Sequence, residues 1–116
     1  MVRKKFFAAS ALILCGSLAL SLMAAAGKAG GNADAAKGKS AFDDSCSMCH
    51  NVDTDEKKMG PSLKGLFKHK ALASGKPVND ANVMAQINNG GNGMPGYADQ
   101  LSADDKANIL AYLHTL

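Results

Sequence analysis

The residues best able to do chemistry are two cysteines and a histidine in the stretch Cys46-Ser47-Met48-Cys49-His50. Two thiols at this spacing can each bond to one vinyl group of a haem, and the histidine that follows is then held close to the iron as an axial ligand. A thiol-disulfide oxidoreductase would place such cysteines after a strand, and a structural zinc site would need two further Cys or His ligands. A disulfide between Cys46 and Cys49 would stabilise little, because it closes only a tiny loop. The stretch therefore predicts one covalently attached haem c.

The second axial position of the iron decides the use of such a haem, because an open position permits catalysis or gas binding and a closed one favours electron transfer. Met94 is the predicted second ligand. It stands in irregular chain between Gly93 and Pro95-Gly96, far along the chain from His50. Backbone of this kind can lie over the opposite face of a haem without a helix in the way. A thioether ligand also raises the reduction potential of the iron.

Other candidates for this position fit less well. Met48 lies between the two cysteines, Met59 is tied close to His50 by a short loop, and Met84 belongs to an apolar helical stripe where core packing is expected. His114 is nearly terminal and is expected to be a solvated histidine, so His69 and an open site remain as the alternatives.

The segments that must position these residues all read as helices or loops. Periodic apolar residues and capping residues predict helices over residues 35–49, with Asp34 as N-cap, over 81–88, with Asp80 as N-cap, and from Ser102 to the end of the chain. A short helical turn is expected after Gly60-Pro61, over residues 63–67. The glycine-rich run at 88–93 follows no strand and precedes no Lys-Ser or Lys-Thr, so it predicts no phosphate site. No segment alternates as a strand would, and the fold class is expected to be all-α.

The N-terminal segment, residues 1–26, is interpreted as a signal peptide. Three basic residues precede an apolar run over residues 6–23, and Ala24-Ala25-Ala26 suits cleavage before Gly27. An uncleaved membrane anchor is the alternative, because the run is long enough to cross a bilayer. Cys15 follows Leu14, where a lipoprotein signal needs a small residue. Residues 27–33 are expected to be a flexible lead to a single domain at 34–116.

Charge gives no support for a nucleic-acid partner. The chain has 13 basic and 10 acidic residues, but three of the basic residues lie in the predicted signal peptide. The remaining chain is then formally neutral, so no anionic macromolecule is indicated. A membrane contact is expected only if the signal segment stays uncleaved.

The motifs beyond the haem stretch give the chain a clear resemblance to class I cytochromes c over residues 34–116. The shared motifs follow that family's order: Gly38 and Phe42, then residues 46–50, then the Gly-Pro-Ser-Leu-Lys-Gly-Leu-Phe run at 60–67, then Gly-Met-Pro-Gly-Tyr at 93–97, then Tyr112-Leu113 in a terminal helix.

The resemblance implies a cytochrome c fold of about three to four helices wrapped around one haem, with the N- and C-terminal helices crossing at Gly38 and Phe42. It implies that the Pro61 carbonyl accepts the proton on the second ring nitrogen of His50. The side chains expected to line the haem pocket are Leu63, Leu66, Phe67 and Tyr97.

The expected function is that of a soluble one-electron carrier in a respiratory or related redox chain. The resemblance to bacterial members, together with the export signal, implies a periplasmic monomer that redox donor and acceptor proteins meet transiently at the haem edge. No catalytic residue is expected. Two alternatives remain: a peroxidase or gas-binding protein with an open iron position, and a haem module held by an anchor or as a subunit of a larger oxidoreductase.

Overall fold

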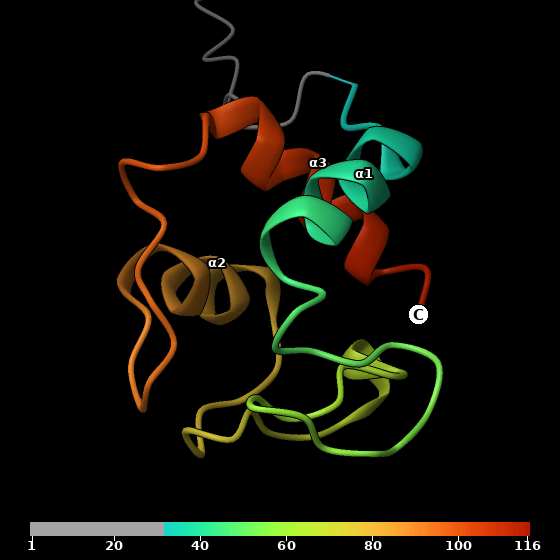
Figure 1. Cartoon of the computed structure of the whole chain (residues 1–116), viewed down its shortest axis with the longest axis vertical. Coiled ribbons are helices and arrows are strands. Elements are labelled where there is room, and N and C mark those ends of the chain that lie inside the picture. Colours follow the sequence, from blue (N-terminus) through green and yellow to red (C-terminus); the bar gives the residue numbers. More distant parts are fainter. Residues whose placement is uncertain (1–31) are drawn as a thin grey trace, which may run out of the picture.

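Three α-helices and one short 3-10 helix organise the chain in the computed structural model, which describes residues 32–116 (Figure 1). In order they are α1 (Ala35–Ser45), the 3-10 helix η1 (Leu66–Lys68), α2 (Asp80–Asn89) and α3 (Ala103–Leu113). No strand occurs within residues 32–116, where only two isolated bridges pair backbone segments. The all-α prediction is confirmed. The predicted signal peptide at 1–26 and most of the flexible lead at 27–33 lie outside the described residues.

The helix starts follow capping chemistry, with one correction. The Asp34 carboxylate accepts from the backbone N–H groups of Ala36 and Lys37, and Ser102 forms the predicted capping box with Asp105. The second helix begins one residue earlier than expected. Asn79 is its N-cap, because the Asn79 side-chain oxygen accepts from the N–H of Asn82 at 2.8 Å, so the predicted cap Asp80 is the first helical residue.

The first helix ends at Ser45, before the two cysteines, although the sequence predicted helix to residue 49. The backbone N–H groups of Cys46 and Ser47 both donate to the Phe42 carbonyl, which closes the helix with a wider turn. The N–H groups of Cys49 and His50 then both donate to the Cys46 carbonyl. Residues 46–49 therefore form turns of their own, because these shared acceptors replace the regular helical pattern.

The contact between α1 and α3 is the centre of the core, and Figure 1 shows α1 lying across α3. Gly38 faces the Asn108 backbone so closely that a Cβ on residue 38 would lie 1.8 Å from the Asn108 carbonyl oxygen. Beside it, Phe42 is 2% exposed, and its ring meets that of Tyr112 at a centroid distance of 5.4 Å. The expected packing of the terminal helices is present.

The second helix joins this core through its apolar side and through a hydrogen bond from a lysine of α3. Val83 and Ile87 are buried with the α1 and α3 residues in one apolar cluster. Lys106 of α3 donates to the Asn88 side chain at 2.9 Å and to the Ala98 carbonyl at 3.1 Å, which fixes the chain that follows α2. Among residues 32–116, no helix has both the length and the apolarity needed to cross a bilayer.

The close approach at Gly38 generates a stability prediction. Alanine favours helix over glycine by about 1 kcal/mol, whereas overpacking costs about 1–3 kcal/mol or more. Because the added Cβ would overlap the Asn108 carbonyl, overpacking outweighs helix propensity, and Gly38→Ala should lower the melting temperature of the haem-bound protein. Thermal unfolding followed by circular dichroism measures this. Ser40→Ala, at an exposed position of the same helix, is the control; a Gly38→Ala variant as stable as the wild type would contradict the packing argument.

Candidate haem-binding site

The two cysteines stand at the two ends of the turn at residues 46–49, which directly follows α1, and they do not form a disulfide. Burial raises the pKa of the Cys46 thiol to about 11, and the neighbouring Cys49 adds to the shift. Without haem, the Cys46 thiol is therefore protonated at neutral pH and sits in apolar surroundings. Two unpaired, half-buried thiols on one short turn are the arrangement that thioether attachment requires.

The ring of His50 is held by backbone on one side. Its Nδ1 atom lies 2.8 Å from the Pro61 carbonyl oxygen, so Nδ1 carries the proton and donates it there. This fixes the tautomer and leaves Nε2 as the ring nitrogen suited to bind iron. Gly60 makes the contact possible, because a Cβ on residue 60 would lie 2.6 Å from His50 Cε1. The contact implied by the family resemblance is thus present.

Met94 is presented by a tight hairpin that follows α2. The Gly91 N–H donates to the Met94 carbonyl at 2.9 Å, and the Met94 N–H donates back to the Gly91 carbonyl at 3.1 Å. All four residues at 90–93 have positive φ angles, which explains the glycines at three of them. The Met94 side chain is half-buried. The hairpin therefore fixes the backbone of Met94 while its thioether stays accessible.

Gln86 is a site residue that the sequence did not reveal. Its side-chain Nε2 donates to the Gly90 carbonyl at 3.0 Å and lies 3.8 Å from the Met94 sulfur. No local pattern marks this glutamine, because its closeness to Met94 depends on how the chain turns back after α2. Its amide can donate a weak hydrogen bond to the thioether sulfur.

The four predicted pocket side chains lie in or against the apolar core cluster. Leu66 is buried, whereas Leu63, Phe67 and Tyr97 are half-buried and pack on the cluster. The Tyr97 hydroxyl donates to the Ser45 carbonyl at 2.9 Å, immediately before the first cysteine. Burial raises the Tyr97 pKa, and Cys46 and Cys49 add to the shift, which agrees with a position beside the turn at residues 46–49.

The histidines considered as alternative ligands have other contacts. The His114 ring stacks on that of Phe67 at a centroid distance of 3.6 Å, and its Nε2 atom lies 2.7 Å from an Asp80 carboxylate oxygen. His69 places its Nε2 atom 3.1 Å from the Lys64 carbonyl oxygen. His114 is exposed, as expected for a nearly terminal histidine, and it also connects the end of α3 with η1 and with the start of α2.

These residues suit a c-type haem on structural grounds. The site offers two unpaired thiols, an imidazole with a fixed tautomer, and a thioether on a rigid hairpin. Two surface cavities, of about 540 and 550 Å³, lie along α3 and contain none of these residues. The site and the helix order are those of an all-α protein whose residues suit one covalently bound haem.

Comparison with known proteins gives the family. The family described as cytochrome C oxidase, cbb3-type, subunit III matches residues 33–113. Cytochrome c6 of Diacronema lutheri is 30% identical over 80 residues, which cover 69% of this chain and 93% of that protein. Cytochrome c2 iso-1 of Magnetospirillum molischianum is 28% identical over 89 residues, and the match covers 61% of this chain and 89% of that protein.

A solved structure agrees with these relatives. The structure of cytochrome c6 from the diatom Phaeodactylum tricornutum superposes on this chain with a TM-score of 0.54 and 26% sequence identity. The match covers 71% of this chain and 92% of the cytochrome c6 chain. The chain belongs to the cytochrome c family, as a class I monohaem member. It is an electron carrier with one covalently attached haem c, acts with redox partners, and is not an enzyme.

The contact of Gln86 with Met94 generates a prediction about the reduction potential. With Met94 as the predicted iron ligand, a hydrogen bond to the thioether draws electron density from sulfur, so its loss should favour the ferric state. Gln86→Leu should lower the potential by roughly 40 mV, the equivalent of about 1 kcal/mol for a one-electron couple. Gln100→Leu is the matched control, because Gln100 donates to the nearby Gly96 carbonyl instead. Voltammetry measures both, and an equal shift in the two variants would refute the role of Gln86.

Proposed function

We propose that the haem is held by thioether bonds to Cys46 and Cys49, with His50 and Met94 as axial ligands, for reversible one-electron transfer. The observation that carries this proposal is the presentation of Met94. Its backbone is pinned by two hydrogen bonds to Gly91, and the Gln86 amide is directed at its sulfur. A methionine held in this way suits a permanent ligand, and a permanent ligand favours electron transfer over oxygen chemistry.

Each residue has a defined task in this proposal. When bound, the haem iron supplies the reversible ferric and ferrous couple. Cys46 and Cys49 fix the position of the macrocycle, and the Pro61 carbonyl orients His50 and increases its basicity. Met94 occupies the second axial position and raises the potential. Because helices and hydrogen-bonded turns hold both ligands, little rearrangement accompanies a change of charge.

The ligand assignment predicts the behaviour of Met94→Ala. The oxidised wild-type protein should show a methionine-to-iron charge-transfer band in its visible spectrum, and Met94→Ala should lose it and bind cyanide or carbon monoxide readily. Met84→Ala is the control, because Met84 lies half-buried on α2 and lines a surface cavity that contains none of the proposed haem-binding residues. Survival of the band in Met94→Ala would show that another side chain is the ligand, and its absence from the wild type would indicate an open or differently ligated iron.

We further propose that residues 1–26 export the chain and are removed, leaving a periplasmic monomer that partners meet transiently at the haem edge. Three basic residues, an apolar run and Ala24-Ala25-Ala26 support this. The alternatives are an uncleaved anchor and a permanent subunit of a larger oxidoreductase. The match to a family described as an oxidase subunit supports the alternative of a permanent subunit.

Fractionation of cells that express the full chain separates these possibilities. Release by osmotic shock, an N-terminus at Gly27 and a gel-filtration mass near that of one mature chain are expected for an exported monomer. Recovery of the haem protein with the membranes, with its N-terminal segment intact, would indicate an anchor. Co-migration with a larger haem complex would indicate a subunit.

A further inference from the structure

Two asparagines close to Met94 are each followed by a glycine. They are Asn89 and Asn92, which form the two Asn-Gly pairs of the whole sequence. In such a pair the backbone nitrogen of the glycine can attack the side-chain amide of the asparagine, because glycine has no side chain to block the approach. The attack needs a backbone nitrogen that is free of hydrogen bonds, and it needs room for the ring that forms. The two pairs differ on both requirements.

Asn89-Gly90 meets neither requirement. Asn89 is the last residue of α2, and the Gly90 N–H donates to the Gln86 carbonyl at 2.8 Å. A Cβ on residue 90 would lie 2.2 Å from the Met94 carbonyl oxygen, so the backbone is tightly packed at this point. Attack by the Gly90 nitrogen would have to break this hydrogen bond and disturb this packing. The pair is therefore protected by the fold.

Asn92-Gly93 meets both requirements, at the tip of the hairpin that presents Met94. The two hydrogen bonds of this hairpin join Gly91 with Met94 and do not involve the Gly93 N–H. Within residues 32–116, neither this N–H nor the Asn92 side chain has a hydrogen-bond partner. Apart from its chain neighbours, no described atom lies within 4 Å of the place that a Cβ on residue 93 would occupy. The Gly93 nitrogen can therefore turn toward the Asn92 amide.

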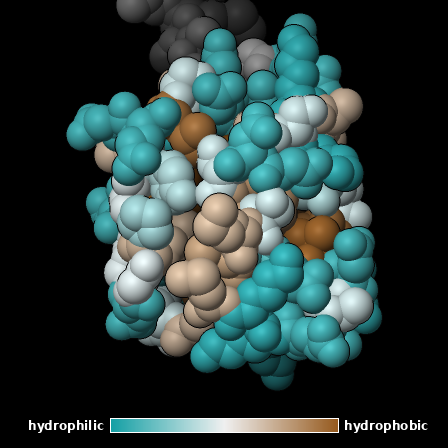
Figure 2. Space-filling view, in the orientation of Figure 1, coloured by the Kyte–Doolittle hydropathy of each residue, from teal (hydrophilic) through white to brown (hydrophobic). Residues whose placement is uncertain are grey.

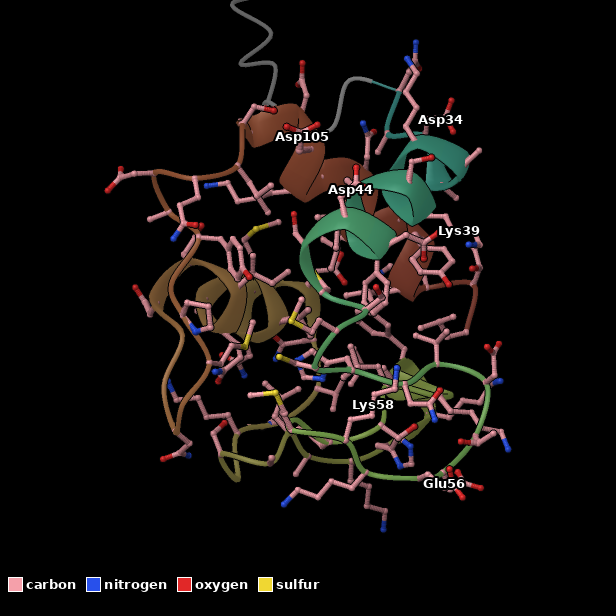
Figure 3. All side chains as sticks on the ribbon, in the orientation of Figure 1. Asp34, Lys39, Asp44, Glu56, Lys58 and Asp105 are labelled. Carbon is pink, nitrogen blue, oxygen red and sulfur yellow. The ribbon has the colours of Figure 1, made fainter. Side chains whose placement is uncertain are left out.

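The tip of this hairpin lies at the edge of the molecule. Figure 1 shows it at the end of the orange segment that follows α2. In Figure 3 the labelled Glu56 and Lys58 lie far across the view from this tip, so these charged side chains do not cover it. In the same orientation, Figure 2 shows that the edges of this face are mostly hydrophilic. Both Asn92 and Gly93 are exposed, so water reaches them.

We propose that Asn92 is a site of spontaneous deamidation, which converts it into a mixture of aspartate and isoaspartate. The Gly93 nitrogen bonds to the Asn92 Cγ atom, and the bond from Cγ to the side-chain nitrogen breaks. That nitrogen leaves as ammonia, with the proton that the Gly93 nitrogen gives up. Water then opens the imide ring at one of its two C–N bonds. One opening gives aspartate, and the other gives isoaspartate, in which the main chain runs through the former side chain.

Isoaspartate at position 92 disturbs the presentation of Met94. Only residues 92 and 93 lie between the hydrogen-bonded residues Gly91 and Met94, and isoaspartate adds one atom to the main chain of this short turn. The two hydrogen bonds between Gly91 and Met94 then lose their present geometry. This consequence rests on the proposed function, in which Met94 is an iron ligand. Deamidation with age therefore loosens the ligand and opens the iron to small molecules.

The modification itself is tested by mass. The haem-bound full chain is incubated in neutral buffer over days, and peptide mass spectrometry measures deamidation at Asn89 and at Asn92 separately. Asn92 should react at least about tenfold faster, because the Gly90 hydrogen bond adds to the barrier at Asn89. Asn92→Gln should remove the modified product, because glutamine would have to close a larger ring. Asn89→Gln is the matched control and should leave the product unchanged.

The effect on Met94 is tested by ligand binding. Aged wild-type protein that carries isoaspartate should bind cyanide about tenfold faster than fresh protein, because the bonds that hold Met94 are weakened. It should lose the charge-transfer band in proportion to its isoaspartate content. Asn92→Asp introduces the same charge without lengthening the main chain, and it should keep both the band and the slow cyanide binding of the fresh protein.

Two results would overturn the inference. Equal rates at Asn89 and Asn92, or an unmodified Asn92 in aged protein, would refute the site of deamidation. Isoaspartate at position 92 with unchanged cyanide binding would refute its effect on Met94. The mass measurement does not depend on the iron ligands, whereas the charge-transfer band does. A fresh wild-type protein without that band would therefore refute the proposed function and leave the site of deamidation standing.

Discussion

The close contact of α1 with α3 at Gly38 is the constraint on which the rest of the structure depends. With no side chain on residue 38, the α1 backbone can approach the Asn108 carbonyl directly. The Asp34 N–H donates to the Asn108 side chain at 2.7 Å, and Phe42 packs on Tyr112 one turn further along α1. The direction of α1 is thus set by α3. The contact with α3 also sets where in the fold α1 ends, and the two cysteines follow directly after that end.

Beyond the end of α1, short polar contacts position Cys49 and His50. The Pro61 carbonyl holds the His50 ring, the Gly60 N–H returns to the Cys49 carbonyl, and the Tyr97 hydroxyl reaches the Ser45 carbonyl. Each contact joins residues far apart on the chain or across a loop. Individually such hydrogen bonds contribute about 1 kcal/mol, so their main effect is to select one loop conformation on a frame that the helices already provide.

Sequence patterns predicted what depends on local chemistry. The caps at Asp34 and Ser102 and the all-α class follow from side chains within a few residues of each other. The predicted end of α1 at residue 49 was wrong, because periodicity does not reveal that Cys46 and Ser47 share the Phe42 carbonyl. Gln86 was missed for a related reason, since tertiary folding brings it to Met94. The family resemblance, rather than local chemistry, indicated the contact of His50 with Pro61.

The contacts of His114 show what holds the segments around His50 and Met94 in place relative to each other. His114 stacks on Phe67 and pairs with Asp80, so it connects α3 with η1 and α2. Both side chains in the contact of His114 with Asp80 are about half exposed, and an exposed contact of this kind contributes at most about 1 kcal/mol. Val83, Ile87 and Leu66 are buried in the cluster formed by α1 and α3, and burial of each large apolar side chain contributes about 1.5–3 kcal/mol. The relative placement of the His50 and Met94 segments is therefore set mainly by this shared apolar core, and His114 only reinforces it.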